Sequence, residues 1–194
     1  PSHALFEALK YDVEERQRQN LSAVIAESDR RVEEEPDLDR RVAILEDVLK
    51  LYPGEPHFEH ALRLVRDKRD LVNSIVSKAR FFEERGQYNE ALDQWQILRS
   101  IHERQPGLPF EIERLMKRRE QHARATGKAR WVEQTDRYLE AGDYDRALKT
   151  IQNALAEFPG EPDLLELEKL VHKNLARGAE AQAEFARARE LGEK

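Results

Sequence analysis

Residues 128–162, KARWVEQTDRYLEAGDYDRALKTIQNALAEFPGEP, contain the two interruptions that set the fold of this chain. AGDY at 141–144 and PGEP at 159–162 both carry the glycine that is typical of a helix C-terminus, and PGEP adds a proline that suits the first turn of the next helix. A helix cannot run through Pro-Gly-x-Pro. AGDY is therefore the turn inside a helical hairpin, and PGEP is the joint to the next hairpin.

The same joint occurs as PGEP at 53–56 and as PGLP at 106–109, so that consecutive joints lie 53 residues apart. Each joint follows an internal turn, at 35–38, 85–88 and 141–144. A fixed period of this kind is typical of repeat proteins, in which each repeat unit buries its apolar face against its neighbours. The internal turns are not evenly spaced, which predicts a longer second helix in the middle unit.

The punctuation predicts an all-α, elongated superhelix of stacked helical hairpins with about eight helices. The predicted long helices cover 3–34, 57–84 and 110–140, the shorter second helices cover 38–51, 88–104 and 144–158, and the final pair covers 163–177 and 179–191. Residues 1–194 are expected to form a single repeat domain, with units at about 3–53, 56–106, 109–159 and 162–191. The stretch around Gly127 has no large apolar residue, so the helix could bend there.

The composition excludes several classes of protein. The chain has 194 residues, of which 37% are charged, a net charge of -6 and no cysteine. The absence of cysteine excludes disulfides and thiolate chemistry, and no apolar run is long enough to span a bilayer. The acidic balance argues against nucleic acid as the main ligand. We expect a cytoplasmic protein without membrane insertion, and the opening Pro-Ser-His predicts a fragment of a longer protein.

Residues 128–162 closely resemble a tetratricopeptide repeat. The matching positions are Trp131, Tyr138, Gly142, Tyr144, Ala147, Ile151, Ala154 and Pro159. A repeat of that family has about 34 residues, whereas this chain repeats every 53 because its first helices are elongated. Segments such as SIVSKARFFEERGQYNEALDQW also look similar to helical regions that follow the catalytic domain in some bacterial serine/threonine kinases of eukaryotic type.

The resemblance implies that a ligand would meet the inner face, which is lined by the first helices. The matching positions on that face are Asn73, Ser77, Arg80, Glu133, Asp136 and Glu140. An alternative site is a basic patch in the third long helix, formed by Arg114, Lys117, Arg118 and Arg119, although acidic neighbours favour a solvated helix face.

The residues predict no catalytic, cofactor or metal site. His57 and His60 stand three apart, whereas a zinc-protease helix needs histidines four apart and a third ligand.

We therefore expect a non-catalytic interaction or scaffold module for a partner peptide or helix. It would be the regulatory region of a larger signalling protein such as a bacterial serine/threonine kinase, in which case only the parent protein is an enzyme. The alternatives are a self-association or spacer module and a nucleic-acid-binding helical repeat. The chain itself is expected to be a monomer or weak homodimer.

Overall fold

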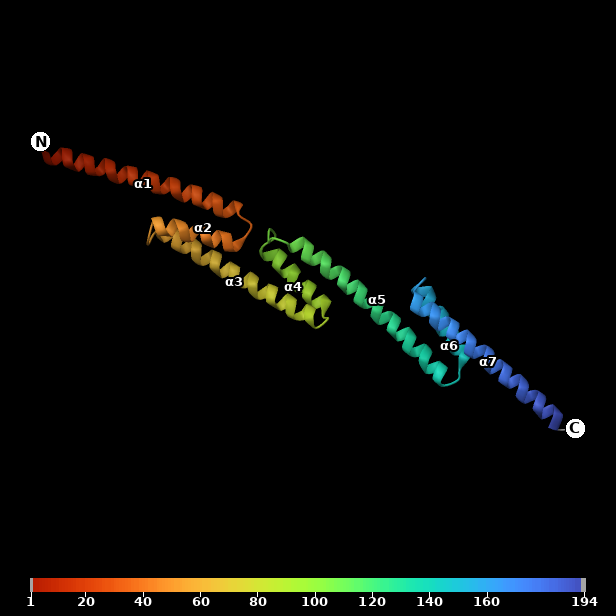
Figure 1. The fold of residues 1–194 in the computed structure, drawn as a ribbon. Helices are drawn as coiled ribbons and strands as arrows, with labels where there is room; N and C mark the ends of the chain where they lie inside the picture. The colour runs from red at the N-terminus through yellow and green to blue at the C-terminus, as the bar shows by residue number, and fades with distance from the viewer. Residues whose placement is uncertain (1, 193–194) are drawn as a thin grey trace. The chain divides into compact units, whose positions relative to one another are not determined.

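The computed structural model describes residues 2–192, and every regular element in this range is an α-helix (Figure 1). The prediction of an all-α protein is therefore confirmed. The helices are α1 (Ser2–Glu34), α2 (Leu38–Leu51), α3 (Pro56–Glu84), α4 (Tyr88–Ile101), α5 (Leu108–Glu140), α6 (Tyr144–Glu157) and α7 (Pro162–Gly192).

Local chemistry sets the helix ends. The side chain of Asp37 accepts hydrogen bonds from the backbone N–H groups of Asp39 and Arg40 at the start of α2, and Asp143 accepts one from Arg146 at the start of α6. These bonds satisfy N–H groups that have no partner within the helix. Gly142 and Gly160 adopt φ values of 72° and 74°, which a side chain would make costly. The turns and joints therefore form where the sequence predicts them.

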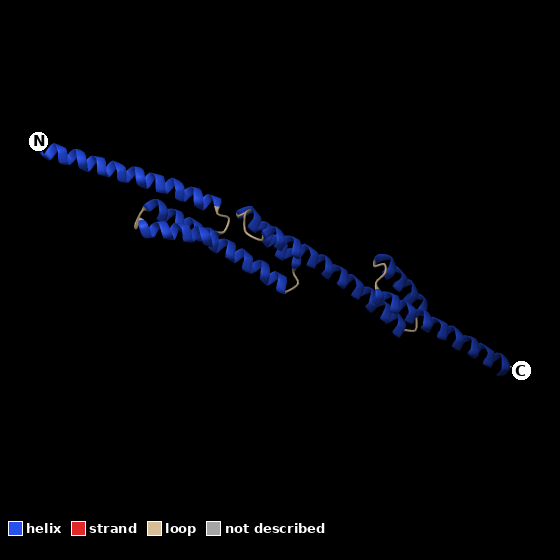
Figure 2. Cartoon of the chain, turned by 45° about the horizontal axis from the view of Figure 1, so that its top comes forward, coloured by secondary structure: helices blue, strands red, loops and turns tan. Residues whose placement is uncertain are grey.

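The chain divides into two compact bodies, an N-terminal body that ends at Arg118 and a C-terminal body that begins at Arg119. Each is built from layers of three helices, in which a short helix packs between the second half of one long helix and the first half of the next. Layer A combines α1, α2 and α3, and layer B combines α3, α4 and α5 (Figure 2). Layer C, in the C-terminal body, combines α5, α6 and α7.

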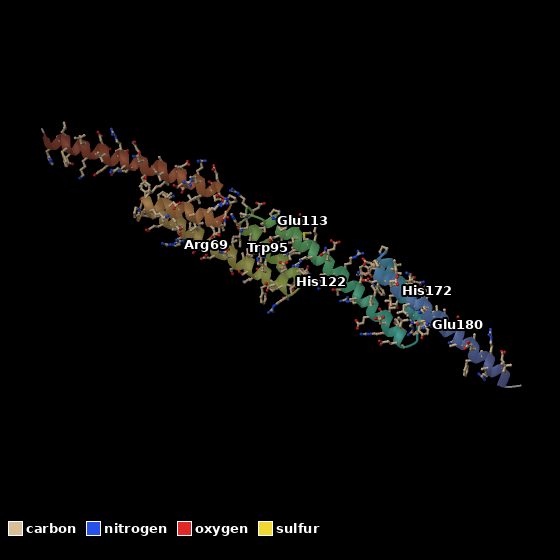
Figure 3. The ribbon with its side chains drawn as sticks, in the orientation of Figure 1. Arg69, Trp95, Glu113, His122, His172 and Glu180 are labelled. Atoms are coloured by element: carbon tan, nitrogen blue, oxygen red, sulfur yellow. The ribbon has the colours of Figure 1, made fainter. Side chains whose placement is uncertain are left out.

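The core of each layer comes from the apolar stripe of its short helix. In layer A, Val42, Leu45 and Val48 of α2 pack with Phe58 and Leu62 of α3. In layer B, the largest core side chain is Trp95 of α4, which is 3% exposed and lies inside the N-terminal body (Figure 3). Layer C is built on the smaller residues Ala147, Ile151 and Ala154, all fully buried. Their buried apolar surface is the main source of stability in each layer.

Helix α4 is shorter than predicted, because His102 and Arg104 bind carbonyl groups at the end of α1 and in the turn after it instead of continuing the helix. The buried imidazole of His102 donates from Nε2 to the Pro36 carbonyl at 2.7 Å, and Arg104 donates to the carbonyls of Glu33 and Glu34. Burial lowers the pKa of His102. The longer middle helix was a wrong prediction. The uneven turn spacing comes from the six-residue joint at 102–107 and from α5, which has 33 residues against 29 in α3.

The predicted final hairpin, 163–177 and 179–191, is also wrong, because α7 runs unbroken through Gly178. A Cβ atom on Gly178 would lie 3.1 Å from the Tyr144 ring, so the glycine allows α7 to approach α6 closely. Gly127 plays the same role in α5, where a Cβ atom would lie 2.9 Å from Cζ of Phe158. The described residues therefore form seven helices rather than about eight, and α5 is continuous at Gly127.

Candidate functional site

The C-terminal body contains a groove of about 630 Å³ between the second half of α5 and the first turn of α7. Its lining residues are Ala125, Lys128, Ala129, Val132, Glu133, Asp136, Arg137, Glu140, Asp163 and Leu164. The groove lies on the long helices of layer C, whose apolar faces pack with α6. Helices α5 and α7 supply all of its lining residues.

The first turn of α7 is held beside α5 by charged contacts from the joint. Glu161 accepts hydrogen bonds from Nζ of Lys128 at 2.7 Å and from the guanidinium of Arg124. Lys128, and then Arg124, lower the pKa of Glu161. On the α6 side, Nε1 of Trp131 donates to the carboxylate of Glu157 at 2.8 Å. The groove is thus bounded by helices that are cross-linked through side chains 26 to 37 positions apart in sequence.

The charge in this groove is predominantly negative. Its lining includes four carboxylates, from Glu133, Asp136, Glu140 and Asp163, and two cationic groups. Of the cations, Lys128 is engaged by Glu161 and Arg137 by Glu133. Within the described part of the chain, Asp136, Glu140 and Asp163 have no ion pair. An excess of exposed negative charge attracts a positively charged ligand.

Three of the residues predicted for partner binding, Glu133, Asp136 and Glu140, come together in this groove. The other three, Asn73, Ser77 and Arg80, are exposed on α3 in the N-terminal body. Arg80 lies 4.0 Å from the carboxylate of Glu111. The structure thus places the six predicted residues on two separate long helices.

The N-terminal body has an equivalent groove of about 400 Å³ on the long helices of layer B. Arg80, Glu83, Glu84, Phe110, Glu111, Arg114 and Arg118 line it. Here the charges neutralise one another. The guanidinium of Arg114 donates to both oxygens of Glu83, at 2.5 and 2.8 Å, and also to Glu111 at 2.7 Å, while Arg118 donates to Glu83 at 2.7 Å. The two grooves therefore share a position in the layer but differ in free charge.

Glu83 is the centre of this network, and its side chain is only 10% exposed. The hydrogen bonds from Arg114, followed in effect by those from Arg118, lower the pKa of Glu83 below its usual value of 4.5. The group therefore stabilises the fold above pH 4.5, and this contribution is lost as the pH falls through the lower pKa of the folded state.

We expect Glu83→Gln to lower the free energy of unfolding by about 1–3 kcal/mol at pH 7, because the guanidinium groups of Arg114 and Arg118 lose the carboxylate that they share. The difference from the unmodified chain should shrink as the pH falls below 4.5. Urea denaturation followed by circular dichroism between about pH 7 and pH 3 measures both effects. A difference that stays constant over this range would contradict the role assigned to the carboxylate.

The predicted basic patch is largely paired with acidic residues. Arg114 and Arg118 contact Glu83, and Lys117 lies 3.0 Å from Glu113. Arg119 also has an interaction partner. The patch therefore carries less free positive charge than its sequence indicates.

Sequence reasoning missed Asp163 and Leu164, which complete the groove from α7, and Glu83, which neutralises the other groove. The sequence did contain a signal for Asp163 and Leu164, since the PGEP joint at 159–162 predicts that the next helix begins at these residues. No local signal identifies Glu83, because its partners lie 31 and 35 residues away.

The described residues contain no cluster of three or more potential metal ligands and no helix long and apolar enough to cross a membrane. Comparison of the chain with protein-family models, with curated proteins and with solved structures finds no match.

Proposed function

We propose that the chain is a non-catalytic protein-interaction module that holds a positively charged segment of a partner protein in the groove between α5 and α7. The observation that supports this proposal most directly is the charge of the layer C groove, in which three carboxylates have no ion pair within the described part of the chain. A segment rich in lysine or arginine would supply the missing counter-charges, and its apolar side chains would contact Ala129 and Val132, which are not fully buried.

The tetratricopeptide-like pattern supports this choice of face. In a superhelix of such hairpins, the first helices of consecutive repeats line the inner surface, and α5 and α7 hold those positions in layer C. The proposed module belongs to a larger, signalling protein. A polar groove of this kind favours transient binding, with a dissociation constant of about 1 µM, or about -8 kcal/mol.

The ligand class can be identified by selecting from a displayed library of random peptides with the full chain as bait. We expect the selected peptides to be rich in lysine and arginine. Asp136→Lys combined with Glu140→Lys should weaken binding of a selected peptide at least tenfold in isothermal titration calorimetry, because attraction becomes repulsion. The variant should fold normally, since exposed charges contribute only about 0–1 kcal/mol to stability.

A matched control is Glu180→Lys combined with Glu184→Lys. These residues are also exposed and four positions apart on a helix of the same body, and the change in net charge is identical. The control should bind like the unmodified chain. Equal weakening by both variants would show a nonspecific charge effect, and tight binding of nucleic acid that falls steeply with salt would favour the nucleic-acid alternative.

A further inference from the structure

The first half of α1 carries an apolar stripe that no other described part of the chain covers. Leu5, Phe6, Leu9 and Val13 are 67%, 63%, 57% and 54% exposed. In both views of the N-terminal body, this half of α1 extends past α2 and α3 (Figures 1 and 2). Exposed neighbouring apolar side chains of this kind mark interaction surfaces in soluble proteins.

The first halves of the other long helices are all covered. In layer A, Phe58 and Leu62 of α3 are buried against α2, and in layer B Leu108 and Leu115 of α5 are buried against α4. In layer C, Leu164 and Val171 of α7 are buried against α6. In each case the first half of the long helix is covered by the preceding hairpin, which contributes its short helix and the second half of its own long helix.

The stripe on α1 matches these covered faces in sequence register. Leu5 and Leu9 stand 53 residues before Phe58 and Leu62, which is the spacing of the Pro-Gly-x-Pro joints. One residue out of this register, Phe6, Leu9 and Val13 have the same i, i+3, i+7 spacing as Leu164, Leu167 and Val171, which are buried or partly buried in the core of layer C. The first half of α1 therefore has the side chains that complete a three-helix layer.

We propose that the first half of α1 is a docking surface for a helical hairpin of the same repeat type. The docking helix of that hairpin is expected to carry large or apolar residues at i, i+7 and i+10. The short helices of this chain share that spacing, with Leu38, Leu45 and Val48 in α2, Tyr88, Trp95 and Leu98 in α4, and Tyr144, Ile151 and Ala154 in α6. The completed assembly would be a layer like A, B and C.

A second copy of the chain is a poorer occupant. Its short helices α2, α4 and α6 are each already buried in a layer of their own. A second copy could therefore offer only a long helix, whereas each covered first half in this chain packs against a short helix as well. These contacts favour a hairpin whose short helix is not yet buried in a layer of its own.

The surface can be tested with a hairpin of known sequence as the probe. Residues 16–56, which contain the second half of α1, all of α2 and the joint, are duplicated and fused directly before residue 4 of the full chain. In this fusion Leu5 follows the joint as Phe58 does in the natural sequence. We expect amide hydrogen exchange across residues 5–15 to slow at least tenfold relative to the unfused chain, because the open helix becomes part of a packed layer.

Leu9→Glu in the fusion should abolish this protection. Tyr11→Glu is the matched control, since Tyr11 is also exposed, at 62%, but points to the opposite side of the helix. The control should keep the protection. Unchanged exchange in the fusion, or equal effects of both substitutions, would overturn the proposal. So would an unfused chain that dimerises in sedimentation equilibrium and loses the dimer on Leu9→Glu, because a second copy would then cover the stripe.

Discussion

Phe58→Ala is expected to lower the free energy of unfolding of the N-terminal body by about 3–5 kcal/mol. Phe58 is fully buried, and its ring packs with Val42, Leu45 and Leu62 and lies 6.3 Å from the ring of Tyr52. Removing the ring leaves a cavity at the centre of layer A, and the surrounding helices can only partly close it. Urea denaturation and hydrogen exchange of α2 and α3 measure the loss.

Phe6→Ala is the control for this change. Phe6 is 63% exposed, so the same substitution should change stability by no more than about 0.5 kcal/mol. If Phe58→Ala has an effect as small as the control, then layer A is not a packed core. Opening of layer A should also leave exchange in α6 unaffected, because α6 belongs to the other body.

Ala147→Trp is expected to destabilise the C-terminal body by about 1–3 kcal/mol. Ala147 is fully buried in layer C, among Ile151, Leu164 and Val171, and has no free space for a larger side chain. The indole would push α6 away from α5 or α7. A lower midpoint of thermal unfolding, monitored by circular dichroism, reports the effect.

Ala156→Trp gives the same change of residue on the exposed side of the same helix. Its expected effect on stability is within about 0.5 kcal/mol. Equal unfolding midpoints for the two variants would show that the repeat register of α6 is wrong. A large effect of Ala147→Trp alone would support the repeat register, in which Ala147 is one of the positions that match the tetratricopeptide pattern.

Helix boundaries were predictable because their signals are local. The bounds of α2 are those predicted, and those of α1, α3, α5 and α6 differ by one or two residues. Proline, glycine and a capping aspartate act within a few residues of their own position, so a single pass along the sequence finds them. The bounds of α4 and α7 were predicted wrongly. In both places, contacts with residues distant in the sequence act where the local turn signal predicts a different course of the helix.

The groove was only partly predictable. The repeat register indicated that Glu133, Asp136 and Glu140 share a face of α5, since they recur at helical spacing. It could not indicate that Asp163 joins them from α7. Nor could it show that the equivalent groove in the N-terminal body is neutralised by Glu83.

By itself, the sequence determined an all-helical chain with joints every 53 residues, because turn chemistry and helical periodicity are properties of neighbouring residues. Only the tertiary structure decided that α7 passes through Gly178 and that α4 stops at Ile101. Gly178 is tolerated because Tyr144 packs against it. His102 and Arg104 leave the helix to bind carbonyl groups at the end of α1 and in the turn after it, 66 to 71 positions earlier. Contacts over such separations depend on how the layers pack, which no local pattern encodes.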